Sequence, residues 1–187
     1  MKVVIIGGVA GGASAAARLR RNDENAEIII FERTGYISYA NCGEPYYIGG
    51  VIEEREKLTV QTPKGFKERF NVDVRVKSEV TAIDRDAKKV HVKNLETGEE
   101  YDESYDKLIL SPGAKAVKPD VPGADDERIF SLRTIEDTFA ISDFVEQKQP
   151  KAAIVIGGGF IGLEVAENLM ERGLKVTVLH RGAHVMK

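Results

Sequence analysis

The sequence predicts an α/β fold, with two parallel-sheet units of one kind and a small antiparallel β-meander between them. The first observation is an order of elements that occurs twice: a buried apolar strand, a glycine-rich turn, a helix and a second strand. The second is that the two turns begin at Gly7 and Gly157, 150 residues apart. The third is a run of short alternating strands between the units. A glycine turn that leads into a helix can hold a pyrophosphate, so each unit is predicted to be Rossmann-like and dinucleotide-binding.

The first unit has the spacing of a dinucleotide fingerprint. Glu32 follows the second strand and lies 20 residues after Gly12, the distance at which an acid binds a ribose hydroxyl. The turn departs from the pattern at one position, because Val9 stands where the second glycine belongs. The predicted elements of this unit are a strand over residues 3–6, a helix over 12–21 and a strand over 27–31.

The helix after the first turn has a cationic stripe. Ser14, Arg18 and Arg21 are spaced so that they share one helix face. A solvated face is the usual explanation for such arginines, and an anchor for a phosphate-bearing substrate is the other. The spacing by itself leaves both interpretations open.

Cys42, the only cysteine in 187 residues, lies in a stretch that predicts a short helix. Pro45 suits the first turn of a helix and Gly49-Gly50 its end, so the helix is expected to start at or just after Cys42. The unpaired N–H groups at that end favour the thiolate, the reactive form of the side chain. A buried structural cysteine is the alternative. Three polar neighbours favour the reactive interpretation: Ser38, Asn41 and Glu44.

The middle of the chain changes from helical to β patterns. Thr62-Pro63 begins a helix with Phe66 and Phe70 on its buried side. Residues 72–105 alternate with period two and contain a Thr97-Gly98 turn, so they are predicted to form the small antiparallel sheet. His91 lies in one of its strands and is interpreted as structural.

A further buried strand is predicted over residues 107–110, and Ser111-Pro-Gly113 ends it sharply. At such an end the backbone can approach a ligand closely, although a plain turn would have the same sequence. A linker follows from Pro119. Thr134 with Asp137 then caps a helix that is expected to extend to about Gln147.

The second unit has a complete fingerprint in Gly157, Gly159 and Gly162. Its predicted elements are a strand over 152–156, a helix to about residue 172 and a strand over 175–179. The expected acid is missing, and His180-Arg181 stands in its place. Arginine there suits a 2′-phosphate, so the site favours NADPH over NADH. Two dinucleotide sites in one chain imply electron transfer between them.

Composition excludes several other classes of protein. A net charge of −3, from 27 basic and 30 acidic residues, gives no electrostatic reason to expect nucleic acid as a partner. One cysteine excludes an internal disulfide, and the three histidines have no metal-ligand spacing, which fits a reducing cytoplasmic compartment. The apolar run over residues 3–17 is interrupted by glycines, so strand, turn and helix explain it better than a signal peptide does. No segment has the length of a membrane span.

Four motifs together resemble the pyridine nucleotide–disulfide oxidoreductase family, and within it the coenzyme A-disulfide reductase branch. The resemblance covers essentially the whole chain, and the Asn-Cys-Gly-x-Pro-Tyr stretch is the most specific part. The motifs lie at residues 7–14, 38–47, 105–114 and 157–162.

The resemblance implies roles for particular positions, with Cys42 as the redox-active residue. The positions that match FAD contacts are Gly7, Gly8, Gly12, Glu32, Arg33, Val80, Ser111 and Gly113. Those that match the nicotinamide cofactor site are Gly157, Gly159, Gly162 and Arg181. Those that match coenzyme A contacts are Ser14, Arg18, Arg21, Ser38 and Asn41. It also implies a homodimer at full length.

The chemistry of the cysteine distinguishes branches of the family. Dithiol members need a second cysteine five residues on, where this chain has Tyr47, so Cys42 can cycle only through a mixed disulfide or a sulfenic acid. Peroxidase and oxidase relatives keep a histidine in the first glycine turn, where this chain has Ala10. The expected function is therefore flavin-dependent reduction of coenzyme A disulfide, or of its persulfide, by NAD(P)H. The alternatives are an NAD(P)H oxidase that cycles through a sulfenic acid and a non-catalytic fragment that binds FAD or coenzyme A.

The expected domains are an FAD-binding part over 1–118, a linker and connecting helix over 119–150, and the start of an NAD(P)-binding domain over 151–187. The chain ends just after the second strand of the second unit. We therefore expect that unit to be truncated, and this chain alone not to complete catalysis.

Overall fold

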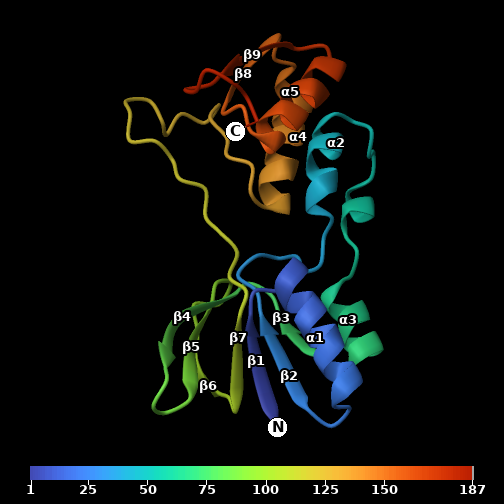
Figure 1. Ribbon diagram of the computed structural model, residues 1–187, viewed down its shortest axis with the longest axis vertical. Coiled ribbons are helices and arrows are strands. Elements are labelled where there is room, and N and C mark those ends of the chain that lie inside the picture. The colour runs from blue at the N-terminus through green and yellow to red at the C-terminus, as the bar shows by residue number, and fades with distance from the viewer. Residues whose placement is uncertain (187) are drawn as a thin grey trace. The chain divides into compact units, whose positions relative to one another are not determined.

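A computed structural model describes residues 1–186 (Figure 1). Its contacts divide the chain into two compact units. Unit 1 comprises Met1–Tyr39 and Thr59–Gly113, and unit 2 comprises Ala40–Leu58 and the chain from Ala114 onward. These units are defined by packing alone, so the expected boundaries at residues 118 and 150, which were drawn by function, stay a prediction. None of the helices within residues 1–186 has the length and apolarity that crossing a membrane requires.

Unit 1 is built on a parallel sheet of four strands in the order β3-β2-β1-β7. Residue Lys2 pairs with Glu27 and Ile6 with Phe31, so β1 and β2 end at the same edge. The elements of the unit outside its meander are β1 Lys2–Ile6, α1 Ala10–Asn22, β2 Glu27–Phe31, α3 Pro63–Phe70, β3 Asp73–Arg75 and β7 Lys107–Leu110.

The two faces of this sheet are covered by different elements (Figure 1). Because side chains alternate along a strand, Ile5 and Ile30 pack on one face with Ala16 of α1 and Phe66 of α3. Ile29, on the opposite face, packs against the meander through β5. The residues of this second cluster are Val4, Ile29, Phe31, Val90 and Val92.

The meander is antiparallel and has the strand order β4-β5-β6. Its strands are β4 Ser78–Asp84, β5 Lys89–Asn94 and β6 Glu100–Ser104. The prediction that all of 72–105 belongs to it was wrong for β3, which pairs in parallel with β2. Alternation identifies a strand but not its partner, which explains the error.

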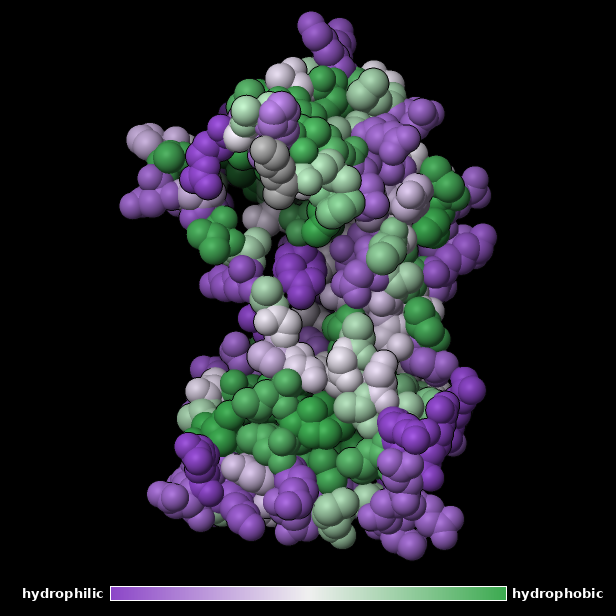
Figure 2. Space-filling model, in the orientation of Figure 1, coloured by the Kyte–Doolittle hydropathy of each residue, from purple (hydrophilic) through white to green (hydrophobic). Residues whose placement is uncertain are grey.

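The prediction of a buried strand over 107–110 was correct for the strand and wrong for its burial. Leu110 is 60% exposed, because β7 is the last strand of the sheet beside β1. Figure 2 shows hydrophobic side chains gathered over this region of unit 1.

Unit 2 packs three helices against a parallel two-stranded sheet. Ile48 of α2 forms a buried cluster with Val145, Leu169 and Leu174. The opposite face of the strands leaves Ile156 79% exposed. The elements are η1 Asn41–Gly43, α2 Glu44–Ile48, η2 Arg55–Leu58, α4 Ile135–Lys148, β8 Ala152–Ile156, α5 Phe160–Glu171 and β9 Lys175–Leu179.

Two helices begin at the capping residues that the sequence predicted. Thr134 and Asp137 form the predicted capping box of α4, in which each side chain accepts a bond from the other residue's backbone N–H. Thr62 caps α3 by accepting from the Gly65 N–H. The helix predicted over 12–21 is longer by two residues at its start and one at its end, as α1.

Candidate functional site

The first glycine turn is held at the carboxyl edge of the parallel sheet. The Gly7 N–H donates to the Phe31 carbonyl at 2.8 Å, and the Gly8 N–H donates to Glu32 Oε2 at 2.7 Å. Glu32 is buried, and its other oxygen accepts from the Thr34 N–H at 2.9 Å. The structure thus brings the predicted acid onto the predicted turn, because β1 and β2 end side by side.

The end of β7 reaches the same turn. The Ser111 N–H donates to the Ile6 carbonyl at 2.8 Å. A Cβ on Gly7, whose φ is +94°, would collide with the Ser111 carbonyl, so only glycine fits there. Gly113 likewise has a φ of +68°. The strand end that was predicted to approach a ligand therefore lies against the first glycine turn.

The remaining predicted FAD contacts, Arg33 and Val80, lie around the edge of the parallel sheet. Arg33 is exposed directly after Glu32. Val80 is half-buried and packs on the cluster between sheet and meander, next to an irregularity of β4 between Val80 and Ala82. Val9, the departure from the fingerprint, has a φ of −89° and a ψ of −130°, a pair that lies outside the main allowed regions of the backbone.

The second turn repeats the first. The Gly157 N–H donates to the Leu179 carbonyl at 2.9 Å, as Gly7 does to Phe31. A Cβ on Gly162 would collide with the Gly157 carbonyl, and one on Gly12 would collide with the Gly7 carbonyl. The third glycine of each fingerprint, Gly12 or Gly162, therefore allows the helix to pack closely on the glycine turn that precedes it.

Both turns lead into helix N-termini that suit an anion. Neither Val9 nor Gly159 caps its helix with a side chain, and neither first turn contains an acidic residue. The first amide N–H groups of α1 and α5 are therefore available to a pyrophosphate. No atom within the described residues lies within 4 Å of a Cβ built on Gly159, which leaves room for a ligand. The residues present thus fit two dinucleotides.

The cationic stripe of α1 is exposed at Ser14, Arg18 and Arg21. Neither arginine has an ion pair with any residue in 1–186. Arg20, which is not part of the predicted stripe, has a structural role. Its guanidinium donates to five carbonyls, those of Asp23, Glu24, Ala26, Phe70 and Asn71.

Cys42 lies in η1, one turn before α2, and its side chain is exposed. The predicted short helix is confirmed, since α2 begins at Glu44 with Pro45 in its first turn and ends before Gly49. A buried structural cysteine does not fit this position. Asn41 lies beside Cys42 in unit 2, whereas Ser38 belongs to unit 1, where its N–H donates to the Gly8 carbonyl at 3.0 Å.

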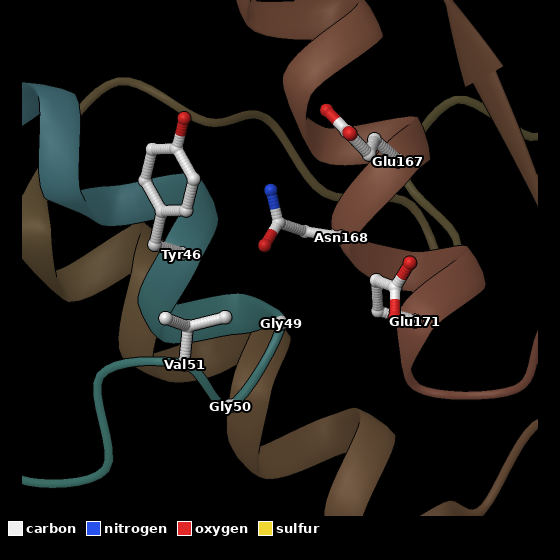
Figure 3. Close-up of a pocket in the computed structure, with 7 residues that line it drawn as sticks. All are labelled: Tyr46, Gly49, Gly50, Val51, Glu167, Asn168 and Glu171. Atoms are coloured by element: carbon white, nitrogen blue, oxygen red, sulfur yellow. The ribbon is translucent and has the colours of Figure 1, made fainter.

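The helix after Cys42 is anchored within unit 2. The Tyr47 ring meets the Phe139 ring of α4 at a centroid distance of 5.4 Å. Figure 3 shows Asn168 of α5 pointing toward α2, in a groove of about 400 Å³ that Tyr46 and Glu171 also line. A Cβ on Gly49 would collide with the Asn168 amide, so this contact requires glycine.

Glu44 is a buried carboxyl two residues after Cys42. It is 5% exposed, and its Oε1 atom has no hydrogen-bond partner among residues 1–186. Burial raises its pKa to about 7, the nearby Arg133 lowers it, and Asp137 and Glu136 add to the rise. From the sequence Glu44 is predicted only to be a polar neighbour of Cys42, because the burial of its side chain depends on contacts of α2 with α4.

Comparisons with known proteins agree with this geometry. The coenzyme A disulfide reductase of Staphylococcus haemolyticus strain JCSC1435 is 48% identical over 186 residues, which are 100% of this chain and 42% of that protein. The structure of reduced Bacillus anthracis CoADR-RHD matches with a TM-score of 0.95 and 55% identity, over 99% of this chain and 33% of that one. An NAD-dependent persulfide reductase from A. fulgidus matches with a TM-score of 0.94 and 38% identity, over 100% of this chain and 34% of that one.

The fold and its two turns define a Rossmann-type α/β protein of the dinucleotide-binding class. A family profile, described as pyridine nucleotide-disulphide oxidoreductase, matches residues 1–187. The chain belongs to the pyridine nucleotide-disulphide oxidoreductase family. It spans 42% of the length of the coenzyme A disulfide reductase named above.

Proposed function

We propose that the full-length protein is a flavin-dependent NAD(P)H oxidoreductase that reduces coenzyme A disulfide or coenzyme A persulfide. One observation carries the proposal: two glycine turns of the same geometry are accompanied by a single exposed cysteine, Cys42. The relatives named coenzyme A disulfide reductase and persulfide reductase support the substrate class.

FAD is assigned to unit 1 and the nicotinamide cofactor to unit 2. Glu32 would accept a ribose hydroxyl of FAD, and the α1 N-terminus would bind its pyrophosphate. Gly7, Gly8, Gly12, Arg33, Val80, Ser111 and Gly113 complete the proposed FAD contacts. Gly157, Gly159, Gly162 and Arg181 are the proposed contacts of NAD(P)H, with Arg181 suited to a 2′-phosphate. Bound FAD would pass the two electrons of NAD(P)H to a disulfide.

The proposed cysteine chemistry rests on Tyr47, which stands five residues after Cys42 where a dithiol member would have its second cysteine. The Cys42 thiolate attacks one sulfur of coenzyme A disulfide, forms a mixed disulfide and releases one coenzyme A thiolate, which takes up a proton. Two electrons then break the mixed disulfide, restore the Cys42 thiolate and release the second coenzyme A. With coenzyme A persulfide as substrate, attack on the sulfur bonded to coenzyme A would form the same mixed disulfide and release sulfide in place of the first coenzyme A.

Coenzyme A phosphates are proposed to bind Arg18 and Arg21, whose guanidinium groups have no ion pair within the described residues. Ser14 on the same face, together with Ser38 and Asn41, completes the proposed set. Replacing both arginines by methionine is expected to weaken coenzyme A binding about tenfold or more, since each loses a charge-assisted contact. Arg85→Met, at an exposed position on the turn after β4, is the matched control.

The mass of the intact protein tests the cysteine step. The full-length protein is purified without reductant and its mass is measured under denaturing conditions, which release FAD but keep any disulfide. An added coenzyme A that reductant removes is the expected result, and Cys42→Ser should lack it and lose disulfide reduction. An added oxygen atom would favour the oxidase alternative, and a free thiol would contradict the mixed disulfide.

A further inference from the structure

The helix that follows Cys42 is too short to be stable by itself. Helix α2 has five residues, Glu44–Ile48, which make little more than one turn. Isolated helices shorter than about 12 residues are marginal in water, because the first turn fixes many dihedral angles for few hydrogen bonds. A helix of this length cannot unwind at one end and persist at the other. The position of Cys42, in the turn that leads into α2, therefore depends on contacts from the rest of unit 2.

The C-terminal end of α2 is capped by a residue from another part of unit 2. The turn that follows α2 supplies N–H partners for the carbonyls of Pro45, Tyr46 and Tyr47. The last carbonyl of the helix, that of Ile48, accepts instead from Arg172 Nη1 at 3.2 Å. Arg172 directly follows α5. Because the last turn of α2 contains no basic residue, Arg172 also supplies the cation that suits the negative end of a helix.

A residue within α5 fixes the same end of α2. Asn168 is 3% exposed and points toward α2 (Figure 3), and a Cβ on Gly49 would collide with its Oδ1 atom. The Asn168 Nδ2 atom donates to the Glu164 carbonyl at 2.8 Å, so the amide is held in this orientation from within α5. Beside it, Leu169 packs against Ile48 in the buried cluster of unit 2. The C-terminal end of α5 therefore holds α2 by close packing as well as by a hydrogen bond.

The N-terminal end of α5 belongs to the proposed nicotinamide site. At the glycine turn there, the Gly158 N–H donates to His180 Nδ1 at 3.2 Å, and the next residue, Arg181, is exposed. The helix has 12 residues and is about 18 Å long, so its two ends serve different groups. One helix thus adjoins both the cofactor turn and the helix of the reactive cysteine.

We propose that Arg172 and Asn168 are positioning residues for Cys42, and that the C-terminal end of α5 holds the cysteine helix in its reactive place. The thiolate must reach one sulfur of coenzyme A disulfide, and a displacement of about 1 Å can cost about a hundredfold in rate. Loss of the Arg172 bond would let α2 open and would disperse the positions of Cys42. The inference rests on the proposed function, in which Cys42 is the reacting group.

This role predicts a loss of kcat without a matching change of KM. The proposed anchors of coenzyme A, Arg18 and Arg21, belong to unit 1, and the cofactor turn lies at the other end of α5. Opening of α2 therefore leaves both sets of binding contacts in place and removes only the alignment of the sulfur. An interaction that acts on the reacting geometry lowers kcat and kcat/KM together.

The full-length protein with Arg172→Met tests this role. Hydrogen exchange measured by mass spectrometry reports local opening, and residues 42–50 are expected to exchange at least about tenfold faster, because a charge-assisted hydrogen bond is lost. The kcat for coenzyme A disulfide should fall about tenfold, with KM for the disulfide and for NAD(P)H within about threefold of the parent. Arg172→Lys, which retains a cationic donor, should recover most of kcat. Lys148→Met, at an exposed position in the last turn of α4, is the matched control and should change none of these values.

The extent of the exchange effect separates positioning from a merely structural role. Positioning speeds exchange in residues 42–50 and leaves β8 and β9 as protected as in the parent, whereas a structural role speeds it throughout unit 2. If Arg172→Met does not unfold cooperatively, Asn168→Ala takes its place, and a fall of about threefold in kcat with the same local exchange is expected.

Two kinds of result overturn the inference. One is unchanged exchange in residues 42–50 or an unchanged kcat, and the other is faster exchange across the whole of unit 2. A parent protein whose reduction of coenzyme A disulfide survives Cys42→Ser overturns the proposed function as well, so the two failures differ.

Discussion

Burial of Glu44 predicts an unusual dependence of stability on pH. Its carboxyl is buried at the first turn of α2, with one oxygen unpartnered within the described part of the chain, and its pKa is raised from 4.5 to about 7. Below about pH 4.5 the group is protonated in both the folded and the unfolded states. Between pH 4.5 and 7 the unfolded chain loses a proton that the folded protein keeps. The contribution of this group to the free energy of unfolding therefore falls as the pH rises through that window.

The size of this fall follows from the two pKa values. One unit of pKa difference corresponds to about 1.36 kcal/mol, so the difference between 4.5 and 7 gives about 3 kcal/mol. Above pH 7 the contribution of Glu44 to the free energy of unfolding no longer changes with pH. Leucine has a similar volume and cannot ionise, so Glu44→Leu removes this pH-dependent contribution.

Urea unfolding at a series of pH values from 4 to 8 measures the effect. The difference in unfolding free energy between Glu44→Leu and the parent should grow by about 3 kcal/mol between pH 4.5 and 7 and then level off. Subtracting the free energy of unfolding of the parent from that of the variant cancels the contributions of the other titrating groups. Glu171→Gln, at an exposed position of α5, is the control and should follow the parent at every pH. A difference that stays constant with pH, or that shrinks as the pH rises, would refute the reasoning.

Two further predictions concern packing. Arg20→Met removes a guanidinium that donates to five carbonyls, so it is expected to lower the free energy of unfolding, measured in urea, by about 3 kcal/mol. Arg21→Met, at an exposed position of the same helix, is the control and should change the free energy of unfolding by less than about 0.5 kcal/mol. Gly49→Ala places a methyl group against the Asn168 amide and should cost about 2 kcal/mol. The same change should cost less in an Asn168→Ala background, and equal costs in a double-mutant cycle would contradict the contact.

Local patterns were sufficient for most of the elements. The two glycine turns and the capping box of α4 were predictable because each depends on residues within one or two turns of chain. The acid after β2 was predictable from its spacing of 20 residues after Gly12. The departure at Val9 has unusual backbone angles, φ −89° and ψ −130°, which local sequence did not predict.

The sequence was sufficient to establish the α/β class, the repeated units and the position of Cys42 at the start of a short helix, because periodicity and turn residues act over short distances. The partner of β3 and the packing of α2 on α4 and α5 could not be predicted from local patterns, since these contacts join segments far apart in the chain. The burial of Glu44 and the carbonyl partners of Arg20 likewise depend on such distant contacts. In each case a polar group or strand takes its role from neighbours that local sequence does not specify.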